Sequence, residues 1–342
     1  MTIVACKPDS VGAGFPEEHQ WRSAMKTAIR DGIELCQRLG LPMRYEAAAA
    51  RASRQFPVFA PHSYVARIQP GNPADPLLRQ VLPLAEEMDE VAGYSADPVD
   101  DLGATILPGM IQKYAGRVLL ITTGACAIHC RYCFRRQYPY AEGPRTADAW
   151  DPTIEKLAED ASIDEVLLSG GDPLTMVDSV LRELVFRLAG IEHLKRIRIH
   201  TRLPVVIPER VTKELISWLR GTRLTPIVVV HANHAAELNE DVAAAFSRLI
   251  DAGIPLLNQS VLLHGVNDNL TALQTLFRRL VDLRVTPYYL HQLDRVTGAA
   301  HFEVPIPRGQ ELIGQLRESL PGYMVPRYVQ DIPGHQAKRI LA

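Results

Sequence analysis

The hydrophobic pattern changes character part-way along the 342-residue chain. In residues 21–39 apolar side chains recur at helical spacing and Gly40 follows as a stop signal, so this stretch predicts a helix. Residues 57–103 contain several prolines and glycines, and only residues 76–90 show helical spacing there. We therefore expect residues 1–103 to form an irregular, mainly helical N-terminal appendage.

After residue 113, short β-branched or apolar runs alternate with amphipathic segments, a pattern typical of parallel βα units. Six runs are candidate strands: 117–123, 165–168, 196–200, 226–231, 255–261 and 286–291. Helical patterns lie between them, at 179–188, 211–220, 241–252 and 270–283. The alternation predicts an α/β fold, a partial (β/α)6 barrel formed by residues 104–342.

Polar side chains stand just past these predicted strands. The second strand leads into Ser169-Gly170-Gly171-Asp172, and later strands lead into sets that begin with His200, His231, Asn258 and His291. In a barrel of parallel strands the carboxyl ends share one face, where such barrels place their active sites. Six units instead of eight leave the barrel partly open, with a mouth wide enough for more than one ligand.

The charge balance excludes some partners. The formal net charge is -2, and no run of lysine and arginine is long enough to bind a polyanion, so nucleic-acid binding is not expected. The first nine residues lack the layout of a signal peptide, and no apolar run approaches the length of a membrane span. We expect a cytoplasmic protein with no membrane partner.

The cysteines carry the first sign of chemistry. They are Cys6, Cys36, Cys126, Cys130 and Cys133. The last three lie in one short loop, too few for a closed zinc site and one too few to ligate every iron of a four-iron cluster. Tyr132 and the strand before the loop favour a cluster, whereas a structural zinc site completed by His129 or a distant histidine is the alternative. The two early cysteines stand alone and are interpreted as incidental.

The cysteine loop resembles the CxxxCxxC signature of radical S-adenosylmethionine (SAM) enzymes. The resemblance implies that Cys126, Cys130 and Cys133 bind a [4Fe-4S] cluster whose open iron is chelated by SAM. Reduction, by a reductase or a flavodoxin-type electron donor, then releases a 5′-deoxyadenosyl radical. By the same resemblance, the methionine moiety of SAM lies at Ser169, Gly170, Gly171 and Asp172, and SAM also contacts His231 and Gln259.

Residues 113–338 resemble the lysine 2,3-aminomutases. The matching stretches are 168–174, 201–206, 258–263, 265–268, 287–290 and 331–334. In length the chain is most similar to the bacterial branch that makes (R)-β-lysine for the modification of elongation factor P. The resemblance implies migration of the α-amino group of L-lysine to the β-carbon, with a separate ligase that attaches the β-lysine to the factor.

The resemblance also implies a second cofactor, pyridoxal 5′-phosphate (PLP), held as a Schiff base by Lys338. The family usually has a run of glycines before this lysine, whereas residues 335–337 here are His, Gln and Ala. The phosphate of PLP is expected at four residues of the first and third predicted units, namely Lys113, Tyr114, Arg117 and Arg202.

A lysine substrate carries a carboxylate and a distal ammonium, so its site needs an arginine and, one side-chain length away, carboxylates. The resemblance places Arg135 on the carboxylate, and Asp294 and Asp331 on the ε-ammonium. The paired aspartates argue against glutamate as the substrate, because they would repel a distal carboxylate.

The chain departs from the larger clostridial-type aminomutases, which continue past the PLP lysine into a segment with zinc-binding cysteines. No cysteine follows Cys133, so we expect neither that structural zinc nor that tetramer, and we expect the N-terminal appendage to cover the open side of the barrel. Two alternatives are an aminomutase for another amino acid and a non-catalytic iron-sulfur or zinc protein that docks a partner.

Overall fold

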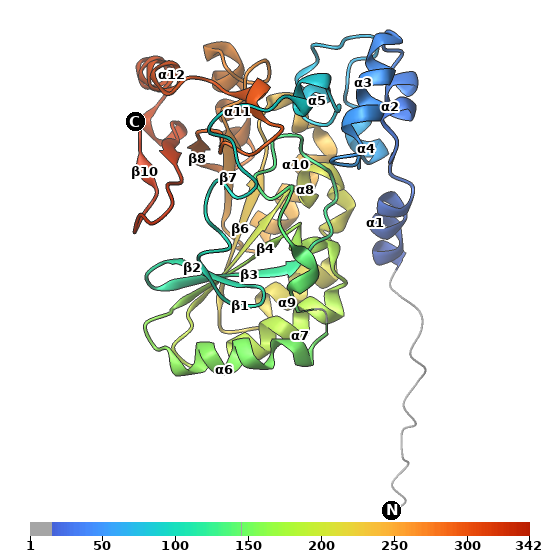
Figure 1. Cartoon of the computed structure of the whole chain (residues 1–342). Coiled ribbons are helices and arrows are strands. Elements are labelled where there is room, and N and C mark those ends of the chain that lie inside the picture. Colours follow the sequence, from blue (N-terminus) through green and yellow to red (C-terminus); the bar gives the residue numbers. More distant parts are fainter. Residues whose placement is uncertain (1–15, 145) are drawn as a thin grey trace, which may run out of the picture.

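The computed structural model describes residues 16–144 and 146–342 (Figure 1). Its N-terminal part consists of short helices: α1 (Pro16–Lys26), α2 (Gly32–Arg38), α3 (Arg44–Ala52), α4 (His62–Val65) and α5 (Pro76–Arg79). The single helix predicted over 21–39 is wrong, because the Asp31 carboxylate accepts hydrogen bonds from the amides of Ile33 and Glu34 and begins a new helix there. The helix predicted over 76–90 is also too long, since Pro83 interrupts it.

One sheet of ten strands follows, in sequence order from β1 to β10. The strands are β1 (Thr105–Leu107), β2 (Met110–Tyr114), β3 (Arg117–Thr123), β4 (Glu165–Gly170), β5 (Arg196–Thr201), β6 (Thr225–His231), β7 (Leu256–Val261), β8 (Thr286–His291), β9 (Arg327–Gln330) and β10 (Arg339–Ile340). Strands β3 to β9 pair in parallel, and the remaining strands pair antiparallel at the two edges. The six predicted strands and the partial barrel are confirmed. The seventh parallel strand, β9, was not predicted, because four residues are too few to show a period.

Helices cover one face of this sheet. They are α6 (Asp151–Glu159), α7 (Asp178–Ala189), α8 (Leu203–Val206), α9 (Lys213–Arg220), α10 (Glu240–Asp251), α11 (Leu270–Asp282) and α12 (Ile306–Ser319). Short 3₁₀ turns complete the connections: η1 (Ala85–Met88), η2 (Tyr140–Glu142), η3 (Asp148–Trp150), η4 (Pro173–Thr175), η5 (Pro208–Arg210), η6 (Ala235–Glu237), η7 (Ala300–Phe302) and η8 (Gly322–Met324). The four predicted helices after the first strand correspond to α7, α9, α10 and α11.

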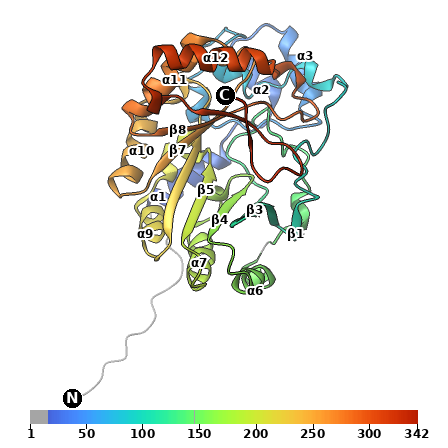
Figure 2. The same ribbon diagram turned by 90° about the vertical axis from the view of Figure 1, so that its left-hand side faces the viewer.

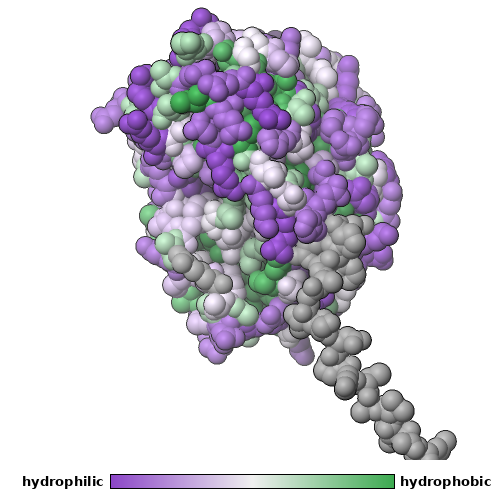
Figure 3. Space-filling view, turned by 90° about the vertical axis from the view of Figure 1, so that its right-hand side faces the viewer, coloured by the Kyte–Doolittle hydropathy of each residue, from purple (hydrophilic) through white to green (hydrophobic). Residues whose placement is uncertain are grey.

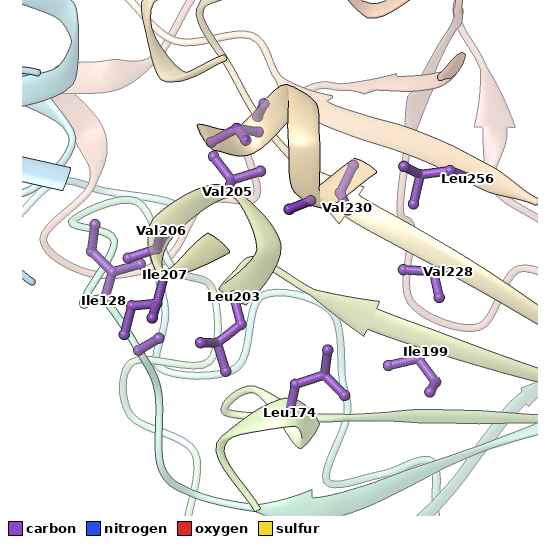
Figure 4. Packing of buried hydrophobic residues seen from close by; sticks show 14 of the residues in the cluster. Ile128, Leu174, Ile199, Leu203, Val205, Val206, Ile207, Val228, Val230 and Leu256 are labelled. Carbon is purple, nitrogen blue, oxygen red and sulfur yellow. The ribbon is translucent and has the colours of Figure 1, made fainter. Parts of the chain in front are cut away.

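The two faces of the sheet differ in burial. Ile199 of β5, Val228 of β6 and Leu256 of β7 are buried in one apolar cluster with Leu203 and Val205 of α8 (Figure 4). Along β5 to β8 several alternate positions are polar and only partly buried: Arg198, His200, His231, Gln259 and His291. Because successive side chains of a strand point to opposite faces, these polar groups line the inside of the barrel.

The open side of the barrel is crossed by two segments. Figure 2 shows the loop between β9 and β10, in dark red, lying across the sheet near β1 and β3. There Tyr114 donates a hydrogen bond of 2.7 Å to Asp331. Residues 95–103 reach the same side, since Ser95 pairs with Val296 after β8. The expected N-terminal cover therefore consists of that stretch, joined by the C-terminal loop. The division at residue 103 stays a prediction.

One face of the outer surface is mostly polar. Figure 3 shows the face that carries the N-terminal helices as mainly hydrophilic, with hydrophobic residues in small separate patches. No helix in the described part of the chain is long and apolar enough to cross a membrane. Nothing on this face marks a large apolar docking surface.

Candidate active site at the mouth of the barrel

The cysteine loop leaves the carboxyl end of β3, where the chain turns over the mouth of the barrel. Its three thiols, of Cys126, Cys130 and Cys133, are free and partly buried. Burial and the neighbouring Cys130 raise the pKa of Cys133 to about 11, and burial, with the nearby Cys133 and Asp172, also raises the pKa of Cys126. Three neighbouring thiolates repel one another, so the loop needs a positive metal group to hold them ionised.

These thiols suit a cluster better than one ion. In residues 16–144 and 146–342, no three His, Cys, Asp or Glu side chains converge at the distances that a single metal ion needs. In an iron-sulfur cluster each thiolate binds a different iron, so the sulfurs need not meet at one point. His129, the alternative zinc ligand, is engaged elsewhere. Its Nδ1 lies 2.9 Å from the carbonyl of Pro57, and its ring stacks on Phe56.

The glycine segment after β4 packs directly on the cysteine loop. The amide of Gly171 donates to the carbonyl of Thr123 and the amide of Asp172 donates to that of Ala125, both at 2.7 Å. A Cβ on Gly171 would lie 2.2 Å from the oxygen of Ala125, and Gly170 has a φ of +130°, which an L side chain rarely adopts. The glycines therefore permit contact between two backbones, and their predicted contact with SAM stays a prediction.

Asp172 is a buried junction between two loops. Its carboxylate accepts hydrogen bonds from the Thr201 hydroxyl and from the amides of Arg202, Leu203 and Leu174. Burial raises its pKa to about 6 despite these bonds. The side chain therefore fixes the turn that follows β5, and its hydrogen-bonding capacity is used within the protein.

Arg202 lies against the cysteine loop. Its Nη1 is 2.7 Å from the sulfur of Cys130, while Nη2 donates to Gln80 at 2.6 Å and to Glu237 at 2.7 Å. These contacts place the guanidinium of Arg202 beside a predicted cluster ligand, and its predicted role at the PLP phosphate stays a prediction. Sequence reasoning missed Gln80 and Glu237, because Gln80 comes from the N-terminal helices and no local pattern links it to β5.

His231 lies at the end of β6 in contact with the middle of the cysteine loop. Its Nε2 is 3.1 Å from the hydroxyl of Tyr132, and the two rings stack at 5.7 Å. Burial lowers the pKa of His231 to about 3, so the ring is neutral at physiological pH. Gln259 is its register partner on β7, which places the two predicted SAM residues side by side on neighbouring strands.

Arg135, the predicted carboxylate ligand, is held by a residue that sequence reasoning missed. Its Nε donates to Asp101 at 2.6 Å, and its Nη1 donates to Ser169 at 3.2 Å. The ammonium of Lys113 is also 2.6 Å from Asp101. Burial alone would raise the pKa of Asp101, but the two cations hold it below its usual value. The structure thus brings Arg135, Lys113 and Ser169 together around one buried carboxylate.

Lys338 lies at the open side of the barrel, in the loop between β9 and β10; we call this place the seam. Its ammonium forms an ion pair with Asp331, whose other oxygen accepts the Tyr114 hydrogen bond. The guanidinium of Arg117 lies 4.6 Å from the centre of the Tyr114 ring. Burial and the nearby Asp331 raise the pKa of Asp294 to about 7, while Lys338 opposes that rise. Five predicted residues therefore form one neighbourhood.

Known proteins resemble this chain over nearly its full length. A family model described as "Radical SAM superfamily" matches residues 120–273. The L-lysine 2,3-aminomutases of Escherichia coli K12 and Haemophilus influenzae are each 40% identical to it, over 94% and 95% of this chain and 94% and 96% of their own. The L-lysine 2,3-aminomutase of Clostridium subterminale is 35% identical over 94% of this chain and 77% of its own.

The chain belongs to the lysine 2,3-aminomutase family. It is a radical SAM protein, so a [4Fe-4S] cluster and SAM are its implied cofactors. The residues fit the cluster: three soft thiol donors share one loop, Arg202 supplies a cation beside Cys130, and the loop is held on both sides by hydrogen bonds.

A buried ion cluster ties the N-terminal helices of this family member to its cysteine loop. Glu87, 1% exposed, accepts from Arg131 at 2.8 and 2.6 Å and from Arg136 at 2.7 Å.

Two further histidines, His200 and His291, have an Nε2 atom that is buried without a hydrogen-bond partner among the described residues. Both lie on the inner face of the barrel, so a ligand inside it can satisfy them.

Proposed function

We propose that this protein catalyses the lysine 2,3-aminomutase reaction, converting L-lysine to (R)-β-lysine with PLP bound to Lys338. The observation that carries the proposal is the meeting of Lys338, Asp331 and Tyr114 at the seam, although Tyr114 and Asp331 are 217 positions apart. An amine, a carboxylate and a phenol brought together from both ends of the barrel form a built site. Membership of the family supports the same reading.

The charged residues match the two ends of a lysine substrate. The guanidinium of Arg135 is the natural ligand for the α-carboxylate, and its planar fork offers two parallel hydrogen bonds. Asp294 and Asp331 are the acceptors for the ε-ammonium. Binding of that cation beside Asp294 lowers the raised pKa of its carboxyl group and ionises it.

The residues at the seam also fit PLP. A cavity of about 470 Å³ lies beside them; Lys113, Tyr114 and Asp331 are among its lining residues, whereas Lys338 is not. Lys113 and Arg117 supply positive charge for the phosphate. PLP, when bound, would supply the electron-accepting group that migration of the amino nitrogen needs. While Lys338 would hold PLP in the resting protein, its amine would not pair with Asp331 as an ammonium, and the Asp331 carboxylate would be open to the ε-ammonium of an incoming lysine.

The radical end of the site lies at the cysteine loop. The cluster and SAM, when bound, supply the radical that takes a hydrogen atom from the substrate. Cys126, Cys130 and Cys133 hold the cluster. We propose that SAM lies against the glycine segment after β4, residues 169–172, and contacts the neutral His231 and Gln259 on the inner face of the barrel. The glycine segment also holds the cysteine loop in place.

The biological role that we propose is the supply of β-lysine for elongation factor P. A separate ligase would attach the β-lysine, and a reductase or flavodoxin-type donor would supply the electron, both in the cytoplasm. We also propose that residues 1–103 and 104–342 are two structural parts of one enzyme. The match in length to the relatives from Escherichia coli and Haemophilus influenzae supports this branch of the family.

The assignment of PLP to Lys338 is tested by borohydride reduction of the PLP-loaded protein and peptide mapping. A pyridoxyl adduct should form on Lys338, should be absent from Lys338→Ala, and should persist in Lys195→Ala, which removes an exposed lysine. Anaerobic incubation with L-lysine, SAM and dithionite should yield (R)-β-lysine. Absence of product with all cofactors bound would contradict the proposal, and a product from another amino acid would move the protein to a sister aminomutase. The docking alternative predicts no adduct.

A further inference from the structure

We propose that Asp101 is a positioning residue that fixes Arg135 in the orientation needed to bind the substrate carboxylate. This inference rests on the proposed function and deepens it. Asp101 is 2% exposed and forms short ion pairs, of 2.6 Å each, with Arg135 and with Lys113. Its two partners are thus the residues assigned to the substrate carboxylate and to the cofactor phosphate.

The contacts of Arg135 determine which edge of its guanidinium can bind an anion. A guanidinium offers five N–H groups in a plane. Asp101 takes the Nε hydrogen, Ser169 takes one Nη1 hydrogen, and the Phe134 ring packs 4.7 Å from the central carbon. Among the described residues, Nη2 has no hydrogen-bond partner. The Nη1–Nη2 edge is therefore the one left for a bidentate carboxylate.

The backbone of Asp101 is itself held in place by hydrogen bonds. Its amide donates to Asp97 at 2.9 Å, and the amide of Leu102 donates to the other oxygen of the same carboxylate at 2.9 Å. The carbonyl of Asp101 also accepts from the Thr105 hydroxyl at 2.9 Å. A backbone held by these bonds keeps the Asp101 carboxylate in one place. It acts as a fixed anchor and not as a mobile substitute for the substrate carboxylate.

Removal of the Asp101 carboxylate should affect the binding of L-lysine and the binding of PLP differently. Replacing Asp101 by asparagine removes the charge that orients Arg135, so the substrate carboxylate loses a pre-positioned partner. The same replacement removes the negative charge beside Lys113, so the attraction of this lysine for a phosphate does not weaken. Lysine binding should therefore weaken while PLP binding does not. A general loss of structure would weaken both.

The experiment compares Asp101→Asn with the wild type in the cofactor-loaded protein. The KM for L-lysine should rise roughly tenfold or more. Inhibition by L-lysinamide, which lacks the carboxylate, should change by less than about twofold, since no carboxylate is there to dock. PLP affinity, measured by absorbance titration without substrate, should be unchanged or higher. Asp251→Asn, which removes the carboxylate of an exposed pair with Arg284, is the matched control and should leave all three values unchanged.

An unchanged KM for lysine, or a lower one, would overturn the inference; a lower KM would identify Asp101 as a competitor of the substrate. Weakened PLP binding in a folded variant would also overturn it. If Asp101→Asn does not fold, Ser169→Ala removes the second anchor of Arg135 and should raise the KM for lysine several-fold, and no rise would overturn the inference. Failure of the proposed function is recognised separately, because the wild type would then form no β-lysine and no adduct on Lys338.

Discussion

Replacing Gly171 by alanine places a methyl group against the backbone of the cysteine loop. The new Cβ would lie 2.2 Å from the oxygen and 2.7 Å from the carbonyl carbon of Ala125. Ordinary carbon–oxygen contacts begin at about 3.3 Å, so one of the two backbones must move by roughly 1 Å. Neither neighbour is the flexible end of a side chain, so the strain cannot be relieved by a change of rotamer.

That displacement acts on both stability and cofactor binding. Overpacking of this kind costs about 1–3 kcal/mol in the free energy of unfolding. It also disturbs the two 2.7 Å hydrogen bonds that join residues 171 and 172 to the loop. The three thiols move with the loop, so we expect Gly171→Ala to bind substantially less than a full cluster.

The assay is iron and sulfide content after anaerobic reconstitution, together with thermal unfolding of the protein before reconstitution. Gly314→Ala is the matched control, because a Cβ at Gly314 in α12 meets nothing within 4 Å. That control should bind a full cluster and be as stable as the wild type or slightly more stable. A Gly171→Ala protein with full cluster content and unchanged stability would refute the reasoning that the glycine permits close contact of the two loops.

Two further outcomes are expected. Glu87→Gln leaves Arg131 and Arg136 buried beside a neutral partner and should lower the free energy of unfolding, measured by urea denaturation, by about 3 kcal/mol. Glu311→Gln, in an exposed pair with Arg308, should change it by less than about 1 kcal/mol. Equal effects of the two substitutions would contradict the argument that burial makes the Glu87 pairs costly to break. The pKa of Asp294 is about 7 in the folded protein and 3.8 for the free side chain. Between these two pH values the folded state keeps a proton on this carboxyl group that the unfolded state has lost. The free energy of unfolding contributed by Asp294 therefore falls as the pH rises from about 4 to about 7. Asp294→Asn should remove that part of the decline, and parallel pH profiles for the two proteins would show that its pKa is ordinary.

Local pattern was enough to predict the barrel and the place of its chemistry. The alternation of strand and helix periods predicted six parallel strands at nearly their observed bounds. The spacing of three cysteines after the first of these strands predicted a loop that binds a metal cluster. Polar sets such as those that begin with His200 and His231 were expected at the carboxyl ends of the strands, and these two residues lie in the last two positions of β5 and β6. These features depend on neighbours within a few positions, which is where sequence periodicity carries information.

Contacts between distant segments were decided only by the tertiary structure. Asp101 joins Arg135 to Lys113, and Glu87 joins the N-terminal helices to the cysteine loop, yet no period or spacing marks either residue. Arg202 contacts Cys130, a partner that no sequence pattern marked, because the turn fixed by Asp172 directs it there; its predicted role at the PLP phosphate stays a prediction. Such partners are selected by three-dimensional packing around buried charges. Sequence determined which residue types reach the mouth of the barrel, and the fold determined which of them hold one another.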